Sequence, residues 1–366
     1  MENMTEPISQ SKILSFNDLL LQPTDPKTKY RRRNTELKTA VHWGQRKLFL
    51  NELLFLTLFA SKVKNPIVLY VGAAPGKHIP FIASLFPMIE WHLYDPAVFT
   101  INISKNIHIY QDYFTNKTAE EWSKKKDHLD ETKLLNQRIL FISDIRSADP
   151  LKVGSKNFEE VVSRDMKMQQ DWYLIVNPAY GILKFRLPYP TETLKISKYL
   201  FGYVFKQPWA PQTSTETRLI PMRDEKGNFK TVDWDLLNYE QQLFHFNTEI
   251  REKVKYSNIL TNNPSYTEKE LIDDYDSGFE IIAWQMYLKS IGGEKSVTSA
   301  NVISMSNLLT SKINDRKPKN EWDTLKKMRT NPYRIKARNA NRQGPKVRNR
   351  NKHNKSRRTR KNTRNN

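Results

Sequence analysis

The pattern of apolar and polar positions along the chain predicts helices that alternate with short strands. Between residues 44 and 63, apolar side chains recur on a helical period, which predicts an amphipathic helix ending before Asn65-Pro66. The next run, Ile67–Val71, is short and β-branched, as in a buried parallel strand, and residues 79–86 again have a helical pattern. A strand, a tight turn and a helix therefore follow one another directly.

The same alternation continues to about residue 290. Strands are expected at residues 90–94, 107–110, 139–142 and 182–187, and helical segments at residues 158–168, 234–251 and 271–288. An apolar run at residues 172–176, a run at 217–222 and a turn at 225–228 lie between them. We therefore predict an α/β fold with a mostly parallel central sheet flanked by helices, and a ligand at the carboxyl edge of that sheet.

Size and composition limit the classes of protein that fit. The chain has 366 residues, 38% of them hydrophobic, which is enough for one large domain or two smaller ones. The longest apolar run, residues 53–60, is too short to span a bilayer, and the N-terminus lacks a secretory profile, so we expect a cytoplasmic protein. The absence of Cys excludes thiol catalysis and disulfides, and seven His without paired spacing predict no metal site.

The net charge of +21 is distributed unevenly. Residues 334–366 contain 14 Lys or Arg and no acid, which leaves +7 for the rest of the chain. We therefore predict an irregular arm at residues 1–40, a main domain at 41–330 with helical additions at its C-terminal end, and a disordered basic tail at 331–366. The tail and the basic cluster at residues 27–33 favour a nucleic acid partner; a solubility tail or a nuclear address remains the alternative.

The turn after the first strand contains Gly72 and Gly76, which let backbone amides approach a ligand closely. Its spacing does not fit the phosphate-binding loop, and Ala74 stands where the dinucleotide motif needs Gly. Asp95, at the end of the next strand, is placed to accept both ribose hydroxyls of a nucleoside. These features fit S-adenosylmethionine, and an ordinary turn without a ligand is the alternative.

Four charged residues lie at the ends of predicted elements: Lys47, Asp144, Lys184 and Glu216. An α/β sheet would bring them together at one edge. Two lysines and two carboxylates in a dry cleft suit removal of a proton from a ribose hydroxyl during methyl transfer. A lysine becomes a base only when burial and nearby positive charge lower its pKa from about 10.4. Two ordinary surface ion pairs are the alternative.

Five ordered blocks of sequence resemble the poxvirus cap-specific mRNA 2'-O-methyltransferase family, whose members are also the small regulatory subunit of poly(A) polymerase. The blocks are Gly44 to Leu48, Tyr70 to Ile79, Ile142 to Ser147, Asn177 to Arg186 and Pro208 to Leu219. The resemblance implies a Rossmann-like S-adenosylmethionine-dependent methyltransferase fold. It places the catalytic set on Lys47, Asp144, Lys184 and Glu216. It places the cofactor contacts on Gln45, Tyr70, Gly72, Ala74, Pro75, Gly76, His78, Asp95, Asp144 and Arg146.

The resemblance also implies a pocket that clamps the methylated guanine of an mRNA cap between two aromatic rings, with carboxylates beside it. Tyr189 and Glu240 match one ring and one acid, whereas Thr213 and Thr191 replace the other ring and acid. The missing ring face is open among Trp209, Phe16 and Trp43. The remaining residues that we assign to RNA contact are Arg186 and Arg218.

The sequence therefore predicts a cap-specific ribose 2'-O-methyltransferase in which Lys184 is the general base toward the 2'-hydroxyl of the first transcribed nucleotide. Its expected partners are capped mRNA and a poly(A) polymerase catalytic subunit, in the cytoplasm, a virion or a viral factory. A binding subunit without catalysis is the second hypothesis. Methylation of DNA or protein is the third, and it is weakened because Ser143-Asp144-Ile145-Arg146 stands where an amine-methylating motif would lie.

Overall fold

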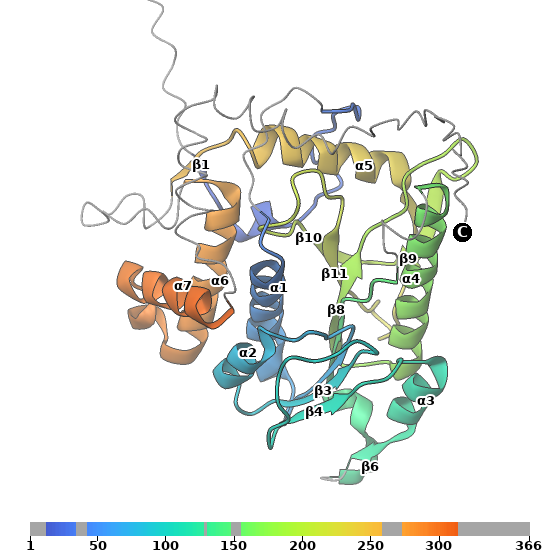
Figure 1. The fold of residues 1–366 in the computed structure, drawn as a ribbon, viewed down its shortest axis with the longest axis vertical. Helices are drawn as coiled ribbons and strands as arrows, with labels where there is room; N and C mark the ends of the chain where they lie inside the picture. Colours follow the sequence, from blue (N-terminus) through green and yellow to red (C-terminus); the bar gives the residue numbers. More distant parts are fainter. Residues whose placement is uncertain (1–11, 34–41, 128–129, 148–154, 258–272, 314–366) are drawn as a thin grey trace, which may run out of the picture.

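A seven-stranded sheet with helices on both faces forms the centre of the molecule (Figure 1). The computed structural model describes residues 12–33, 42–127, 130–147, 155–257 and 273–313. The strands, in sheet order, are β10 (Gly202–Phe205), β11 (Thr217–Pro221), β8 (Tyr180–Phe185), β7 (Ile139–Ser143), β2 (Ile67–Val71), β3 (Glu90–Tyr94) and β4 (Ile107–Tyr110).

The sheet is parallel except around one strand near its edge. Strands β4, β3, β2, β7 and β8 pair in parallel, whereas β11 is antiparallel to both β8 and β10. The expected α/β fold with a mostly parallel, helix-flanked sheet is confirmed. All carboxyl ends of the five parallel strands meet at one edge, where a ligand is expected.

Seven α-helices in the described residues cover the two faces of the sheet. They are α1 (Gly44–Phe59), α2 (Ile79–Leu85), α3 (Asn116–Lys124), α4 (Ser155–Val176), α5 (Leu236–His245), α6 (Tyr275–Gly292) and α7 (Ser299–Ile313). Helices α1, α2, α6 and α7 share one apolar core with the sheet, and α3, α4 and α5 share the other. Within β2, Val68 and Tyr70 join the first core and Leu69 and Val71 the second, because strand side chains alternate between faces.

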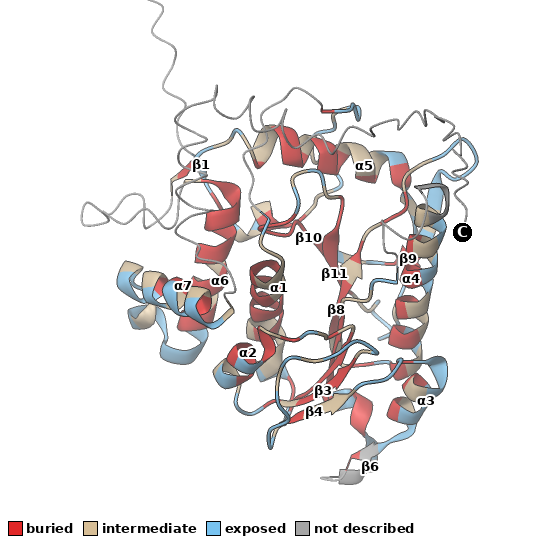
Figure 2. Cartoon of the chain, in the orientation of Figure 1, coloured by how far each residue is buried: buried red, intermediate tan, exposed pale blue. Residues whose placement is uncertain are grey.

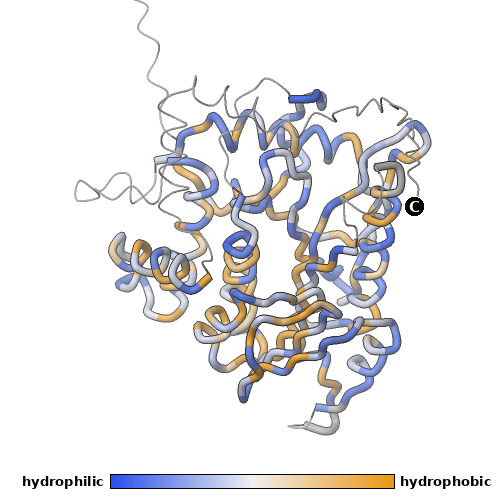
Figure 3. The backbone as a smooth tube through the Cα atoms, in the orientation of Figure 1, coloured by the Kyte–Doolittle hydropathy of each residue, from blue (hydrophilic) through white to orange (hydrophobic). Residues whose placement is uncertain are grey.

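Burial explains why the pattern of apolar residues is visible in the sequence. The central strands and the inner sides of α1 and α6 are buried, while much of α3 and α7 is exposed (Figure 2). Hydrophobic residues are concentrated around the sheet (Figure 3). No helix among the residues that the structure describes is long and apolar enough to cross a membrane.

The structure differs from the sequence prediction in several segments. Helix α4 continues through the apolar run at 172–176, since Trp172, Tyr173 and Val176 lie on its buried side. The helix expected at 234–251 is α5 followed by the π-helical turn η4 (Phe246–Ile250). Helix α3 and strands β9 (Ile196–Leu200), β10 and β12 (Thr231–Asp235) were not predicted, because they are short and their apolar positions are few.

Smaller elements complete the described chain. They are η1 (Phe16–Leu19), η2 (Ala60–Lys62), η3 (Leu135–Arg138) and η5 (Glu294–Ser296), the pair β1 (Lys12–Ile13) and β13 (Tyr256–Ser257), and the pair β5 (Lys126–Asp127) and β6 (Asp130–Leu134). The arm at residues 12–33 packs on the core, since Leu19 and Leu20 are buried. The basic tail at 331–366 lies outside the described residues. The division of the chain into an arm, a main domain and a tail stays a prediction.

A buried ion pair joins helix α1 to the C-terminal helices. The Arg46 guanidinium donates to both carboxylate oxygens of Glu280, with Nε 2.7 Å from Oε2, and also to Thr310 at 2.8 Å. Glu280 is fully buried and accepts further hydrogen bonds from Ser306 at 2.7 Å and the Trp209 indole at 3.2 Å. This network fixes the first turn of α1, which carries Lys47.

Replacement of Glu280 by Ala should lower the free energy of unfolding by about 3–5 kcal/mol, because it leaves the Arg46 charge buried without its partner. The matched control is Glu249→Ala, which breaks the exposed Glu249–Lys253 pair and should cost less than about 1 kcal/mol. Urea unfolding of the three proteins measures the difference. Equal losses of unfolding free energy in the two variants would show that the buried pair stabilises the fold no more than the exposed pair does.

Candidate active site

The four predicted catalytic residues meet at the carboxyl edge of the sheet. Asp144 directly follows β7, Lys184 lies near the end of β8, and Lys47 lies in the first turn of α1. Glu216 directly precedes β11, whose antiparallel pairing places Thr217 opposite Phe185 and therefore at the same edge. The fold thus brings together side chains that are up to 169 residues apart in the sequence.

Contacts among these residues form one buried cluster. The Lys47 ammonium donates to Glu216, and Lys184 Nζ lies 3.1 Å from Asp144 Oδ1 and 3.6 Å from Glu216 Oε2. Their side chains are between 8 and 16% exposed. The cluster is therefore not a pair of surface salt bridges. Because each charged group contacts at least one other, the ionisation of one group affects that of its neighbours.

Arg218 and Gln207 extend the cluster. Arg218 Nη2 lies 2.7 Å from Asp144 Oδ1, and its Nε donates to Gln207 at 2.9 Å. Gln207 in turn donates to Glu216 Oε1 at 3.1 Å. The Arg218 side chain is only 5% exposed, so the structure places this predicted RNA contact inside the buried cluster. The sequence analysis did not identify Gln207, since a single Gln between two strands belongs to no recognisable motif.

The pKa shifts in the cluster follow from burial and from the neighbouring charges. Burial raises the pKa of Glu216, but Lys184, Lys47 and Arg218 outweigh it and hold that pKa well below its usual value. Burial also opposes ionisation of Asp144, yet Arg218 and Lys184 lower its pKa. Burial lowers the pKa of Lys47, and the attraction of Glu216 offsets this only in part. Both carboxylates are therefore charged at neutral pH.

The glycine turn lies beside this cluster. Gly72 has φ +84° and Gly76 φ +73°, a conformation that favours Gly. A Cβ on Gly72 would lie 2.7 Å from the Ile145 amide nitrogen and 2.8 Å from the Asp144 carbonyl carbon. Only glycine allows the turn to approach the end of β7 so closely. The predicted cofactor residues Ala74 and Pro75 lie within this turn.

Asp95 directly follows β3 and faces the turn. Its Oδ2 accepts the Ala74 amide at 3.0 Å, and its Oδ1 accepts the Ala97 amide at 2.8 Å. Each carboxylate oxygen can accept a further hydrogen bond, which is what two ribose hydroxyls would need. The donor set of the turn and Asp95 therefore fits a nucleoside.

Three other predicted cofactor residues lie in a buried network below the turn. Tyr70 donates to Glu52 Oε1 at 2.7 Å, and His78 lies 2.9 Å from Glu52 Oε2 and 2.9 Å from Gln45 Oε1. Burial, followed by the charge of Glu52, raises the pKa of Tyr70 well above its usual value. Glu52, which the sequence analysis missed, fastens α1, β2 and the start of α2 to one another. Its only sequence signal is an acid within an apolar helix.

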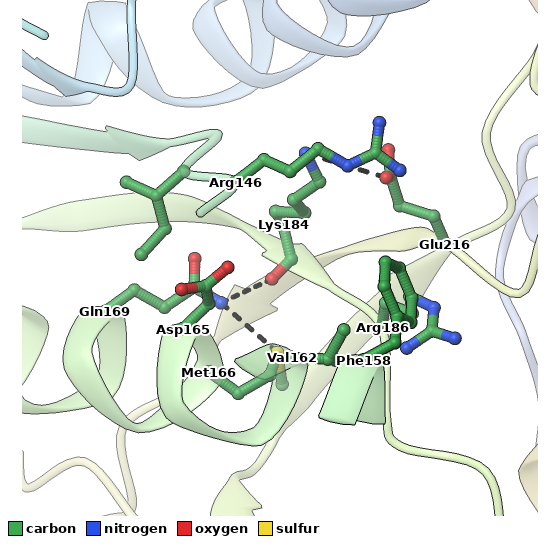
Figure 4. A pocket seen from close by; sticks show the side chains of 10 residues that line it. Arg146, Phe158, Val162, Asp165, Met166, Gln169, Lys184, Arg186 and Glu216 are labelled. Atoms are coloured by element: carbon green, nitrogen blue, oxygen red, sulfur yellow. Dashed lines mark hydrogen bonds and ion pairs between the residues drawn. The ribbon is translucent and has the colours of Figure 1, made fainter. Parts of the chain in front are cut away.

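A small cavity of about 30 Å³ opens beside Lys184 (Figure 4). Phe158, Val162 and Met166 of α4 form its apolar wall, and Figure 4 shows Arg146, Lys184 and Glu216 converging on the opposite side. The remaining lining residues are Ile145, Asp165, Gln169 and Arg186. The cavity thus combines apolar contact area with the charged cluster.

Polar groups are available in this cavity. Gln169 is almost fully buried, and its amide nitrogen donates to the Lys184 carbonyl at 2.5 Å. Its Oε1 has no hydrogen-bond partner among the described residues. An unpaired buried acceptor is costly, so this oxygen is a candidate contact for a ligand donor.

A second hollow, of about 20 Å³, is lined by both predicted cap residues, Tyr189 and Glu240. Tyr30, from the N-terminal arm, also lines it and packs against Phe244 at a ring-centroid distance of 5.3 Å. Partial burial, and then the charge of Glu159, raise the pKa of Glu240. The structure therefore brings a second aromatic ring, Tyr30, to this pair from the N-terminal arm, where the sequence analysis had considered Phe16 instead.

The other candidates for that ring lie elsewhere. Trp209 is fully buried and contacts Trp43 at 4.6 Å between ring centroids, and Phe16 packs on Phe205 at 5.8 Å. Thr213, which replaces the family's ring, does line the hollow. Thr215 lines it too, and its Oγ1 has no hydrogen-bond partner in the part of the chain that the structure describes.

Comparisons with known proteins agree with the resemblance read from the sequence. A cap-specific mRNA (nucleoside-2'-O-)-methyltransferase of Fowlpox virus (strain NVSL) is 30% identical over 223 residues, covering 58% of this chain and 68% of that protein. The protein of the same name from Myxoma virus (strain Lausanne) is 27% identical over 312 residues, covering 80% and 82%.

A solved structure of bluetongue virus VP4, described as a multifunctional RNA-capping production line, is similar with a TM-score of 0.36 and 14% identity over 67% of this chain and 38% of that one. That likeness is too weak to bear on the site. The model of the family described as poly A polymerase regulatory subunit matches residues 10–314. This match spans most of the chain, which therefore belongs to the poly A polymerase regulatory subunit family.

Proposed function

We propose that the protein is an S-adenosylmethionine-dependent methyltransferase that acts on the ribose 2'-hydroxyl of the first transcribed nucleotide of capped mRNA. The observation that carries the proposal is the buried cluster of Lys47, Asp144, Lys184 and Glu216 beside the glycine turn. Two relatives named as cap-specific mRNA 2'-O-methyltransferases support it.

The methyl donor would be held by the turn from Gly72 to Gly76 and by the Asp95 carboxylate, and it supplies an electrophilic methyl group on a sulfonium. A pyrophosphate is stabilised by cationic side chains around it. Lys77 is one such side chain, but the next residue, His78, is buried and does not offer a second one. A nucleoside without phosphates suits this turn better than a dinucleotide does.

The charge balance of the cluster favours removal of one proton from a lysine. Lys47, Lys184 and Arg218 carry three positive charges against the two carboxylates of Asp144 and Glu216. Burial penalises net charge, so loss of one ammonium proton brings the cluster to neutrality. Lys184 lines the cavity beside α4, which makes it the lysine placed to receive the proton of a ribose hydroxyl.

The two carboxylates have a different role from the base. Lys184 Nζ contacts both Asp144 and Glu216, so its position is fixed by two acceptors. Lys47 also contacts Glu216, and Arg218 contacts Asp144, so each carboxylate is held by at least two cations. The carboxylates therefore act by orientation, and the neighbouring cations keep them ionised.

Cap recognition is assigned to the hollow around Tyr189. A methylated guanine is cationic and is attracted to the face of an aromatic ring, and Tyr189 and Tyr30 offer two such rings. Glu240 supplies a carboxylate in the same hollow, and the unpaired Thr215 hydroxyl supplies a further polar group. The hollow thus gains its second ring from the N-terminal arm, whereas Glu240 is the one acid among the residues that line it.

A second function, as a subunit that assists a poly(A) polymerase, is favoured by the description of the family. The edge strand β10 exposes Tyr203, and the preceding Phe201 is also about half exposed. Both line a groove of about 500 Å³, and neither Lys184 nor Glu216 is among its lining residues. The two functions therefore use different surfaces and are compatible.

Lys184→Ala should abolish ribose methylation, by at least about 100-fold, and leave donor binding unchanged, since no turn residue is altered. Lys184→Arg should be equally inactive, because an arginine keeps the charge but does not accept a proton. Transfer of labelled methyl to capped transcripts measures the rate, and titration calorimetry measures donor affinity. The control is Lys198→Ala on the exposed side of β9, and methylation by Lys184→Arg near the normal rate would contradict the assignment.

Tyr30→Ala and Tyr189→Ala should each reduce the preference for methylated over unmethylated cap analogue by about 3- to 30-fold, because each removes one aromatic face. Fluorescence titration with the two analogues measures the preference. Tyr203→Ala is the matched control, since Tyr30 and Tyr203 are equally exposed at 52%. An unchanged preference in both hollow variants would argue for a ribose methyltransferase that does not read the cap.

Lys184→Ala should retain the ability to lengthen poly(A) products with its polymerase, because no residue that lines the groove beside β10 belongs to the cluster. A primer-extension assay with the catalytic subunit measures the tail length. If this single substitution abolished both methylation and tail extension, the two functions would not use separate surfaces. Circular dichroism of the variant checks that its fold is intact.

A further inference from the structure

Three potential metal ligands lie together on strands β3 and β4, away from the catalytic cluster. Glu90 and His92 point to the same side of β3, and His92 is paired directly with His108 of β4. One ligand atom of each of these residues lies within 4.8 Å of the others. It is the arrangement of two imidazoles and one carboxylate that a transition-metal ion requires.

The donor atoms converge on a single point. His92 Nε2 lies 3.0 Å and His108 Nε2 3.2 Å from the same oxygen, Oε1 of Glu90. The two imidazole rings are stacked, with centroids 4.7 Å apart and an interplanar angle of 22°. Ligands bonded at about 2.0–2.1 Å in a tetrahedral shell are separated by roughly 3.3 Å, so small side-chain shifts would admit an ion.

The surroundings hold the site in shape. His92 Nδ1 lies 3.1 Å from the Tyr110 hydroxyl, and the ring packs edge-on against Trp122 at 4.8 Å. A partner on the second ring nitrogen is what a metal-binding histidine ordinarily has. Lys125, whose Nζ lies over the Trp122 ring at 3.7 Å, adds a positive charge to this face, and the Glu90 carboxylate opposes it.

An ion can reach the site from solvent. The side chains of Glu90 and His108 are 39 and 38% exposed, whereas that of His92 is 11% exposed. The buried side chain of His92 is held in place by its neighbours. Because the other two ligands face solvent, a water molecule can occupy the fourth coordination position of the ion.

We propose that Glu90, His92 and His108 bind one divalent transition-metal ion, for which Zn²⁺ is the preferred probe. Each Nε2 lone pair and one Glu90 oxygen would bond to the ion, and the His92 ring proton would reside on Nδ1 and donate to the Tyr110 hydroxyl. No redox change is involved.

The position of the site favours a structural role. Glu90 and His92 lie five and three residues before Asp95, so the site lies roughly 10–16 Å along the strand from the proposed donor pocket. Strand β4 is a four-residue edge strand that pairs only with β3 in the sheet. An ion shared by the two strands would hold this edge in place. His92 and His108 lie too far apart in sequence for spacing to reveal the site, so the expectation of no metal did not account for it.

Equilibrium dialysis of the untagged full-length protein against micromolar Zn²⁺ tests the proposal. We expect one ion per chain, and at least about 10-fold weaker binding in His108→Ala and in Glu90→Gln, each of which removes one ligand. The control is His245→Ala, which removes a histidine that pairs with Thr28 outside the site. Co²⁺ should give tetrahedral visible absorption bands in the unaltered protein and in the control alone.

Two results would overturn the proposal. One is that the unaltered protein takes up no Zn²⁺ at these concentrations. The other is that both His108→Ala and Glu90→Gln bind the ion as tightly as the unaltered protein does. Glu90→Gln preserves the shape of a partly exposed side chain, so circular dichroism should show a folded variant. None of these readouts depends on methylation, which keeps the metal site separable from the proposed function.

Discussion

The buried contacts of Glu216 are the interaction on which the active site depends. This carboxylate binds Lys47, lies 3.6 Å from Lys184 and accepts a hydrogen bond from Gln207 at 3.1 Å. A carboxylate in a site that is 8% exposed is stable only when its charge is compensated, so a helix, a strand and a loop must all deliver donors to it. The fold can be understood as the scaffold that meets this requirement.

Two buried networks fix the elements that carry these donors. The Arg46–Glu280 pair ties the start of α1 to α6 and α7, one residue away from Lys47. Glu52, one helical turn further along α1, receives Tyr70 of β2 and His78. Helix α1 is therefore held from both sides, and the Lys47 ammonium has little freedom to leave Glu216. Precision in the cluster is thus a consequence of polar contacts inside the apolar cores.

Much of this architecture could be predicted from the sequence, and the failures have a common physical cause. Strands β2, β3 and β4 were predicted with the observed bounds, because β2 is a continuous buried apolar run and the aromatic and β-branched residues of β3 and β4 favour strands. The meeting of Lys47, Asp144, Lys184 and Glu216 at one edge of the sheet was expected because these residues stand at element ends, and their catalytic role stays a prediction. Glu52, Gln207 and Tyr30 were missed, since each acquires its role only from a partner that is distant in sequence. Strand β10 was missed because its alternation covers only four residues.

The arrangement of the cavity beside Lys184 and the hollow around Tyr189 could not be predicted from any local sequence pattern either. Arg186 lines the cavity beside Lys184, and its guanidinium lies 4.8 Å from the centroid of the Tyr189 ring in the second hollow. It is held by Glu159 through two hydrogen bonds of 2.7 and 2.9 Å, and Glu159 also accepts the Tyr189 amide at 3.0 Å. The Arg186–Glu159 pair therefore forms the wall between the two hollows and fixes their spacing. In the proposed reaction, that wall determines which ribose reaches Lys184 when a cap occupies the hollow around Tyr189, so selection of the first nucleotide is a matter of distance rather than of base identity.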